Sequence, residues 1–184
     1  DWRDIRTIAY PLVAGEADPL PPPVAASSPD SAWLSSNALT IVTSRADRQW
    51  NFSVAPAPGF ATLDFTHAAP VTARTLELFS LRLMNHEFCY RPDVTISLSC
   101  KENGNWRMLR SWRMPRSNWQ DDAPLSLSFP RTTARHWRVR FDFRHPFQIA
   151  SIRLHGAARM QNWEGLSGRV LRSRMDEGPP VADE

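Results

Sequence analysis

The sequence is poor in cysteine and has no long apolar run, and each shortage excludes a class of protein. Its 184 residues hold only two cysteines, Cys89 and Cys100, which is too few for a disulfide framework. No run approaches the ~18 apolar residues that cross a membrane, so we expect no membrane partner. The first residues lack the basic start and apolar core of a signal peptide, and no Met precedes them. We therefore expect a processed form or a piece of a longer protein.

Charge of one sign is also scarce. The chain has 22 basic and 19 acidic side chains, a net charge of +3, whereas nucleic-acid binding usually needs a concentrated basic face. Lys101 is the single lysine, so nearly all of the cations are arginine. Arginine favours planar hydrogen bonding and stacking, although coding bias in a GC-rich genome explains the same excess.

Residues 106–116 interleave aromatic and arginine side chains, a composition that can stack on bases and hold phosphates. However, Trp106, Met108 and Trp112 lie two and four residues apart, which is the spacing of one face of a strand. We therefore expect a core strand with arginines on its other face, and we do not expect nucleic acid as a partner.

Alternation of apolar and polar residues predicts β-strands through most of the chain. The clearest case is 136–143, where Trp137 begins the apolar series and arginines stand opposite it. Strands are predicted at 39–44, 49–54, 61–66, 73–80, 94–101, 105–112, 125–129, 136–143 and 147–156. Turns are predicted at 56–59, Ala69-Pro70, Asn103-Gly104 and Pro130, and Asn-Gly is typical of a tight hairpin. So many short strands, with no long helical periodicity, indicate an all-β antiparallel sandwich or barrel.

The length suits one domain, which we expect over residues 1–172. A further short strand is expected at 5–10. Residues 11–32 are rich in proline and predict an extended surface connection, because proline fits neither a helix interior nor a central strand. Residues 173–184 are polar and predict a flexible tail.

The residues show no constellation that supports catalysis or a metal site in this chain. No Gly-x-Ser-x-Gly elbow accompanies the histidines. His86, Cys89 and Cys100 match no zinc spacing. A glycosidase needs two carboxylates on either side of a sugar, and loop acids are usually solvated turn residues instead. The loop acids are Glu87, Glu102, Asp121 and Asp122. We expect no catalytic residue here, and a stand-alone enzyme is the weaker alternative.

Eight tryptophans make the aromatic residues the strongest chemical feature. Trp137, Trp50 and Trp106 fall in strand patterns, so we expect them in the core. Other aromatic residues fall in loops, where a ring can cover the apolar side of a sugar while nearby polar groups bind its hydroxyls. The candidate glycan contacts are Glu87, Phe88, Tyr90, Arg91, Arg116 and Trp119. The alternative is that these aromatic residues only anchor their loops.

Several segments together resemble a discoidin-like, galactose-binding-like domain. Asp93–Trp106 resembles that family's hairpin, Thr133–Arg140 its Ala-Arg-Tyr-Val-Arg-Leu strand, and Gln148–Leu154 its closing strand. Leu154–Gly168 resembles the exit of the β-sandwich in large α-L-rhamnosidase-like glycoside hydrolases of the family 106 type, and Asp1–Pro11 resembles the strand that leads into it. The resemblance implies a two-sheet antiparallel jelly-roll sandwich.

The resemblance further implies a non-catalytic ancillary domain of a larger enzyme, with the catalytic acids in a barrel outside these residues. Its partners are then a glycan and the catalytic domain of the parent chain. The alternative is a purely structural domain that packs against the barrel and has no ligand of its own. Such enzymes usually work outside the cytoplasm, so an extracytoplasmic location is expected.

The family often holds a structural calcium ion through an acid-rich loop and the glutamate of the closing strand. Here Ser151 stands at the glutamate position, and the loop retains only Asp47. Calcium prefers several oxygen ligands, so we expect no cofactor or metal, with a weak calcium site at Asp47 as the alternative.

Overall fold

The computed structural model describes residues 17, 19–30, 38–43, 52–53, 59–79, 82–83, 93–114 and 125–159. The elements are β1 (Ala25–Ser27), α1 (Ala38–Thr43), β2 (Phe52–Ser53), β3 (Phe60–Phe79), β4 (Arg82–Leu83), β5 (Val94–Glu102), β6 (Asn105–Met114), β7 (Leu125–Phe143), β8 (Phe147–Ile149) and β9 (Ser151–His155). One sheet has the order β1-β3-β7-β5-β6, with β9 also paired to β3, and a small sheet has the order β2-β8-β4. All described pairs are antiparallel, which confirms the all-β antiparallel prediction. No helix in these ranges is long and apolar enough to cross a membrane.

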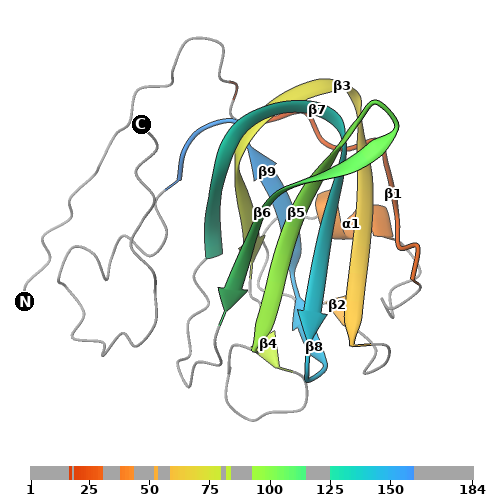
Figure 1. Ribbon diagram of the computed structural model, residues 1–184, viewed down its shortest axis with the longest axis vertical. Helices are drawn as coiled ribbons and strands as arrows, with labels where there is room; N and C mark the ends of the chain where they lie inside the picture. The colour runs from red at the N-terminus through yellow and green to blue at the C-terminus, as the bar shows by residue number, and fades with distance from the viewer. Residues whose placement is uncertain are drawn as a thin grey trace, which may run out of the picture.

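The long strands β3 and β7 form a ribbon that bends over one end of the molecule (Figure 1). Their pairing runs from Phe60 opposite Asp142 to Leu78 opposite Leu125, with register shifts between Thr66 and Val71 and between Ala73 and Thr75. Beyond the bend, β3 also pairs with β9, which lies behind β5 and β7 in Figure 1. The ribbon therefore supplies strands to both sides of the molecule.

The two prolines predicted to end strands lie inside β3 and β7, so the predicted turns at Ala69-Pro70 and Pro130 are wrong. Pro70 falls within the first register shift, and Pro130 falls opposite the second. Proline has no N–H to donate to the ladder, so it is tolerated where pairing is interrupted. Irregularities of this kind allow a strand to bend from one sheet layer into another. The two prolines do interrupt strand pairing, but they mark a bend within continuous strands and not a turn between separate strands.

The hairpin between β5 and β6 confirms the prediction at Asn103-Gly104. Both residues have positive φ, 49° and 84°, as a two-residue hairpin turn requires. In β5 the buried residues alternate with half-buried ones from Val94 to Cys100. That alternation places one face of β5 on the core and leaves the other face outward.

One hydrophobic core joins the two sides of the ribbon. Trp137 is fully buried in it, as predicted, and its Nε1 donates a hydrogen bond to the Ala134 carbonyl at 3.2 Å. The Phe129 ring meets Trp137 edge-on, with 6.0 Å between ring centroids. Other fully buried members include Leu63, Leu76, Leu98, Ile149 and Ile152. Burying such side chains contributes about 1.5–3 kcal/mol each, which makes this core the main source of stability.

The prediction that Trp106 fills the core is wrong, because β6 contains a bulge. The register shifts after Leu98, which lies opposite Arg110, whereas Ser99 lies opposite Met108. Leu109 is therefore the extra residue, and the faces of β6 exchange on either side of it. Trp106 and Met108 lie on the outward face, and Met108 is 64% exposed.

The predicted strand at 39–44 is a short helix, α1. Ile41 and Val42 are both buried, and Ala38 also packs on the core. Spacings of three and four residues fit one face of a helix, whereas adjacent buried residues do not fit one face of a strand. The side chain of Thr43 donates a hydrogen bond to the Leu39 carbonyl at 2.9 Å, as helical threonines do.

Part of the proline-rich connection lies along β3. Val24 donates its N–H to the Thr66 carbonyl at 2.8 Å, and β1 pairs at the edge of the sheet. The buried His67 ring contacts the Pro21 carbonyl through Nδ1 at 2.9 Å. Burial lowers the pKa of His67, although the contact with Pro21 opposes the shift, so the ring is held neutral and donates from Nδ1. These contacts fasten the connection to the bend of β3.

Gly156, directly after β9, gives a test of this fastening. A Cβ at Gly156 would lie 2.2 Å from the Ala17 carbonyl oxygen, so one backbone segment would have to move. We expect Gly156→Ala to lower the free energy of unfolding by about 1–3 kcal/mol, as overpacking does. Gly104→Asn is the control, because its Cβ meets no neighbour and Asn tolerates positive φ. Urea titration measures both, and equal stability of the two variants would contradict the contact.

Candidate functional site

The six predicted glycan contacts lie outside the residues that the structure describes. They are Glu87, Phe88, Tyr90, Arg91, Arg116 and Trp119. The first four fall between β4 and β5, and the last two fall between β6 and β7. Also outside are the predicted strand at 5–10, the tail at 173–184, Trp50, Cys89 and Asp47. All of these stay predictions.

The strands that flank the two predicted contact segments meet at one end of the sheet. Val94 begins β5, and its cross-strand partners are Met114, the last residue of β6, and Phe143, the last residue of β7. Cross-strand partners lie about 5 Å apart. The chain therefore enters β5 and leaves β6 and β7 at adjacent points. We call this the loop-bearing end and define it by Met114, Val94 and Phe143.

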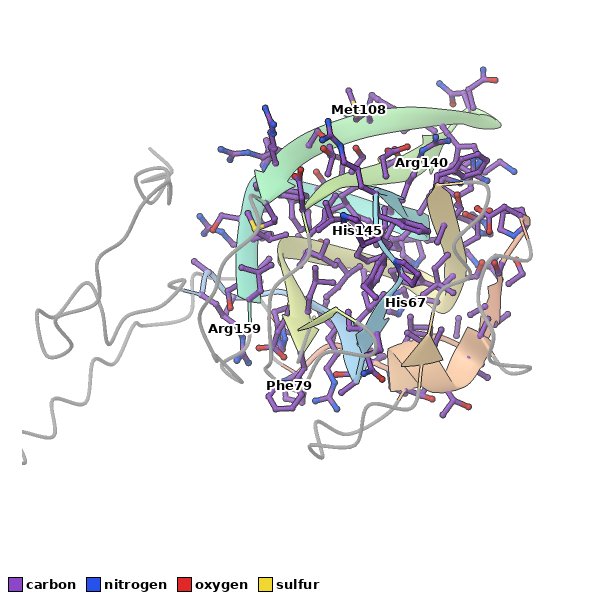
Figure 2. The ribbon with its side chains drawn as sticks, turned by 90° about the horizontal axis from the view of Figure 1, so that it is seen from below. His67, Phe79, Met108, Arg140, His145 and Arg159 are labelled. Atoms are coloured by element: carbon purple, nitrogen blue, oxygen red, sulfur yellow. The ribbon has the colours of Figure 1, made fainter. Side chains whose placement is uncertain are left out.

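Exposed polar side chains lie at the loop-bearing end. Arg113 precedes Met114, and Arg144 and His145 follow Phe143, and all three are exposed. Figure 2 is viewed from this end and shows His145 near the centre of the molecule. Asp93, next to Val94, is half-buried. Sequence reasoning missed these four residues as site candidates, and the signal that could have found them is their position beside predicted strand ends.

A cluster of buried aromatic residues lies in the core directly inside the loop-bearing end. The rings of Phe141 and Phe143 each lie 5.2 Å from the ring of Phe147, centroid to centroid. Phe143 also donates its N–H to the Gly59 carbonyl at 2.9 Å, where Gly59 has a φ of 87°. The cluster fixes the short turn between β7 and β8, so Arg144 and His145 project from a rigid base.

On the outward face of the sheet, Arg138 is held by two partners. Its guanidinium makes a two-pronged ion pair with Asp64, with both N–O distances at 2.6 Å. It also lies 4.2 Å from the centre of the Trp106 ring, which is a cation–π contact. Hydrogen bonding to Asp64 raises the pKa of Arg138. This explains why Trp106 leaves the core: the bulge brings it over the sheet face, where it packs on an arginine.

A second arginine on the same face repeats the arrangement. Arg140 binds Asp142 at 2.7 Å and lies 4.3 Å from the centre of the Phe60 ring. The hydrogen bond to Asp142 raises the pKa of Arg140. Each guanidinium thus has a carboxylate and an aromatic ring from the protein itself. The arginines that the sequence placed opposite Trp137 are therefore largely committed to contacts within the protein.

A buried acid lies on the other side of the molecule, where β3 pairs with β9. The Glu77 carboxylate is 3.3 Å from His155 Nε2 and 3.5 Å from Arg159 Nη1. Burial alone would raise the pKa of Glu77, but attraction to His155, Arg159 and Arg153 outweighs it and holds the pKa below its usual value. Figure 2 shows Arg159 on the opposite side from Met108, so this cluster is separate from the outward face.

No three of His, Cys, Asp and Glu gather as a metal site within the described ranges. Ser151 is buried and offers one hydroxyl. It stands at the closing-strand position that carries a calcium ligand in the discoidin-like family that the sequence resembles. Cys100 is a buried, free cysteine. Burial raises the pKa of its thiol, although the nearby Arg107 opposes the shift, so the thiol stays protonated and unreactive at neutral pH.

No family model matches the sequence, and no curated protein matches it. Solved structures do share its fold. The rhamnosidase from Novosphingobium sp. PP1Y matches with a TM-score of 0.56 at 20% identity, covering 85% of this chain and 13% of the rhamnosidase. A pectin-binding carbohydrate-binding module matches with a TM-score of 0.52 at 16% identity, covering 75% of this chain and 94% of the module. The CBM32 of AlyQ, in complex with 4,5-unsaturated mannuronic acid, matches with a TM-score of 0.50 at 18% identity, covering 73% and 96%.

These likenesses confirm the resemblance at the level of the fold. The antiparallel sheet of this chain matches β-sandwich carbohydrate-binding modules along nearly their whole length. It also matches a small part of a rhamnosidase, of which this chain spans 13%.

The buried acid predicts a specific pH dependence of stability. Because the pKa of Glu77 is lower in the folded state, its stabilisation is present above the pKa of the unfolded state and is lost as pH falls through the folded value. We expect Glu77→Gln to cost about 2 kcal/mol at pH 7, and the difference from wild type to begin to shrink as pH falls below the ordinary glutamate pKa of about 4.3.

Glu102→Gln is the control for this prediction. Glu102 forms a 2.6 Å ion pair with Arg107, but both side chains are half exposed, so its removal should hardly move the unfolding midpoint. Thermal unfolding from pH 3 to pH 8 measures both variants. A Glu77→Gln difference that persists unchanged at pH 3 would contradict the assignment of the charge.

Proposed function

We propose that this chain is a non-catalytic, carbohydrate-binding ancillary domain of a larger glycoside hydrolase that resembles α-L-rhamnosidases. In this proposal the described strands belong to a complete two-sheet jelly roll, and the glycan binds at the loop-bearing end. The predicted contacts are Glu87, Phe88, Tyr90, Arg91, Arg116 and Trp119. Aromatic rings stack on the apolar side of a sugar, while Arg and Glu bind its hydroxyls.

The observation that carries the proposal is the pairing of Val94 with Met114. The segment with Phe88 and Tyr90 joins the sheet at Val94, and the segment with Trp119 leaves it at Met114. Two aromatic-bearing segments that are separate in sequence therefore start from adjacent backbone positions. A sugar site needs this kind of convergence on a rigid support.

The likeness to two carbohydrate-binding modules supports a glycan as ligand, because one is described as binding pectin and the other was solved with a mannuronic acid. The likeness to 13% of a rhamnosidase supports a longer parent protein, in which this domain and a catalytic domain would belong to one polypeptide. By the same resemblance, the location would be extracytoplasmic. Catalysis then belongs to the parent's other domains.

Trp119→Ala tests the proposed contacts. Calorimetric titration of the chain against L-rhamnose, galactose and pectic oligosaccharides should find one class that binds. For that class we expect Trp119→Ala to lower the affinity about ten-fold or more, because buried aromatic contacts dominate binding. The folded state should be unaffected, as shown by an unchanged unfolding midpoint.

Trp106→Ala is the matched control. Trp106 lies eight residues before Met114 on β6, which places it about 26 Å from the loop-bearing end. Its replacement should change the affinity less than two-fold, within ordinary experimental scatter. Equal losses in both variants would argue against a site at the loop-bearing end. A flat response of the wild-type chain to every sugar would instead favour a structural domain that packs against its catalytic neighbour.

A further inference from the structure

Two described arginines at the loop-bearing end have no acidic partner in the part of the chain that the structure describes. Arg113 and Arg144 are both exposed, and no ion pair joins either of them to a described carboxylate. They flank the end from two sides, since Arg113 precedes Met114 and Arg144 follows Phe143. Exposed guanidinium groups on strand ends keep all of their donors available to a ligand.

Three other arginines of the sheet are paired with carboxylates of the protein. Arg107 binds Glu102 at 2.6 Å and 2.8 Å. Arg138 and Arg140 each bind an aspartate of the outward face, as described above. Arg113 and Arg144 differ from these three arginines, because no ion pair joins either of them to a described carboxylate.

The local sequence strengthens this charge difference. Within three residues of Met114, Val94 or Phe143, the acids are Asp93 and Asp142, and Asp142 is neutralised by Arg140. Within the same distance, the cations besides Arg140 are Arg91, Arg113, Arg116 and Arg144. Asp93 is therefore the only acid in this sequence neighbourhood to offset four arginines. Charge of one sign in one place attracts a ligand of the opposite sign.

We infer that the glycan bound at the loop-bearing end carries carboxylate groups, as uronic acids do, and that Arg113 and Arg144 bind them. This inference rests on the proposed function and names the substrate class of the same site. The planar guanidinium matches a carboxylate with two parallel hydrogen bonds, which a neutral hydroxyl cannot accept. The hydrogen bonds to ionised oxygens are also stronger than those to neutral ones.

The test compares one oligosaccharide as the charged free acid and as its uncharged methyl ester, together with a neutral sugar. Unesterified oligogalacturonide, its methyl ester and a neutral galacto-oligosaccharide are titrated into the full chain by calorimetry. We expect the free acid to bind about ten-fold more tightly than the ester, and the difference to shrink in 0.5 M salt. Arg113→Gln and Arg144→Gln should each lower affinity for the acid about five-fold or more and leave affinity for the ester nearly unchanged.

Arg131→Gln is the matched control. Arg131 is likewise exposed and unpaired among the described residues, but it follows Pro130 at the bend, away from the loop-bearing end. The Arg131→Gln variant should bind unesterified oligogalacturonide with the affinity of the wild-type chain. An equal loss in Arg131→Gln would show that only the overall charge matters, and this would overturn the inference.

The remaining outcomes separate this inference from the proposed function. Equal affinity for acid, ester and neutral sugar would overturn the inference and leave the proposed function standing. Absence of binding to every sugar would overturn both. Tighter binding of polyuridylic acid than of oligogalacturonide, with the same dependence on Arg113 and Arg144, would also overturn both and assign the end to nucleic acid.

Discussion

β3 and β7 remain paired from Phe60–Asp142 to Leu78–Leu125 while the ribbon bends between its two register shifts, and the other strands are placed by that pairing. On one side of the bend, β7 pairs with β5 and thereby places β6. On the other side, β3 pairs with β9. Side chains from both sides then share one core. A bend that failed to form would leave both apolar faces exposed, so burial of the core drives the bend.

The same ribbon defines two ends of the molecule with different roles. At the bend, the pairing of β3 with β7 is irregular, and the ribbon changes direction there. The contact between His67 and the Pro21 carbonyl holds the proline-rich connection at the same place. At the opposite end, regular pairing continues to the last residues, so that Met114, Val94 and Phe143 lie side by side. Regular strands over the buried phenylalanine cluster make this second end the stiffer support for ligand-binding loops.

Local patterns predicted the parts of the fold that depend on local physics. Alternation in β5, the Asn103-Gly104 hairpin and burial of Trp137 follow from strand period, turn geometry and the volume of an aromatic side chain. Pro70 and Pro130 marked real interruptions, but proline alone cannot distinguish a turn from a bend in a continuous ribbon. That distinction depends on whether the partner strand bends too, which is a property of two distant segments.

Two errors had separate causes, an unbroken strand period assumed for β6 and strand propensity assumed to decide α1. The bulge at Leu109 exchanges the faces of β6, and a bulge is set by pairing with β5 rather than by the β6 sequence. The β-branched residues of α1 favour a strand by propensity, yet core packing of Ile41 and Val42 selects a helix. For the candidate site, the sequence identified polar and aromatic segments, but the adjacency of their attachment points needed the register of three strands.

The outward face and the loop-bearing end differ in how much of their chemistry is still available. On the outward face, Arg138 and Arg140 already have a carboxylate and a ring each, so a ligand there would have to compete with contacts inside the protein. At the loop-bearing end, Arg113 and Arg144 are exposed with no such partner among the described residues. A ligand gains most where it replaces only water, because it then breaks no protein contact. Composition alone would favour a binding site on the face with more arginines and aromatic rings. Because those arginines are already paired within the protein, the loop-bearing end is the better place for a ligand.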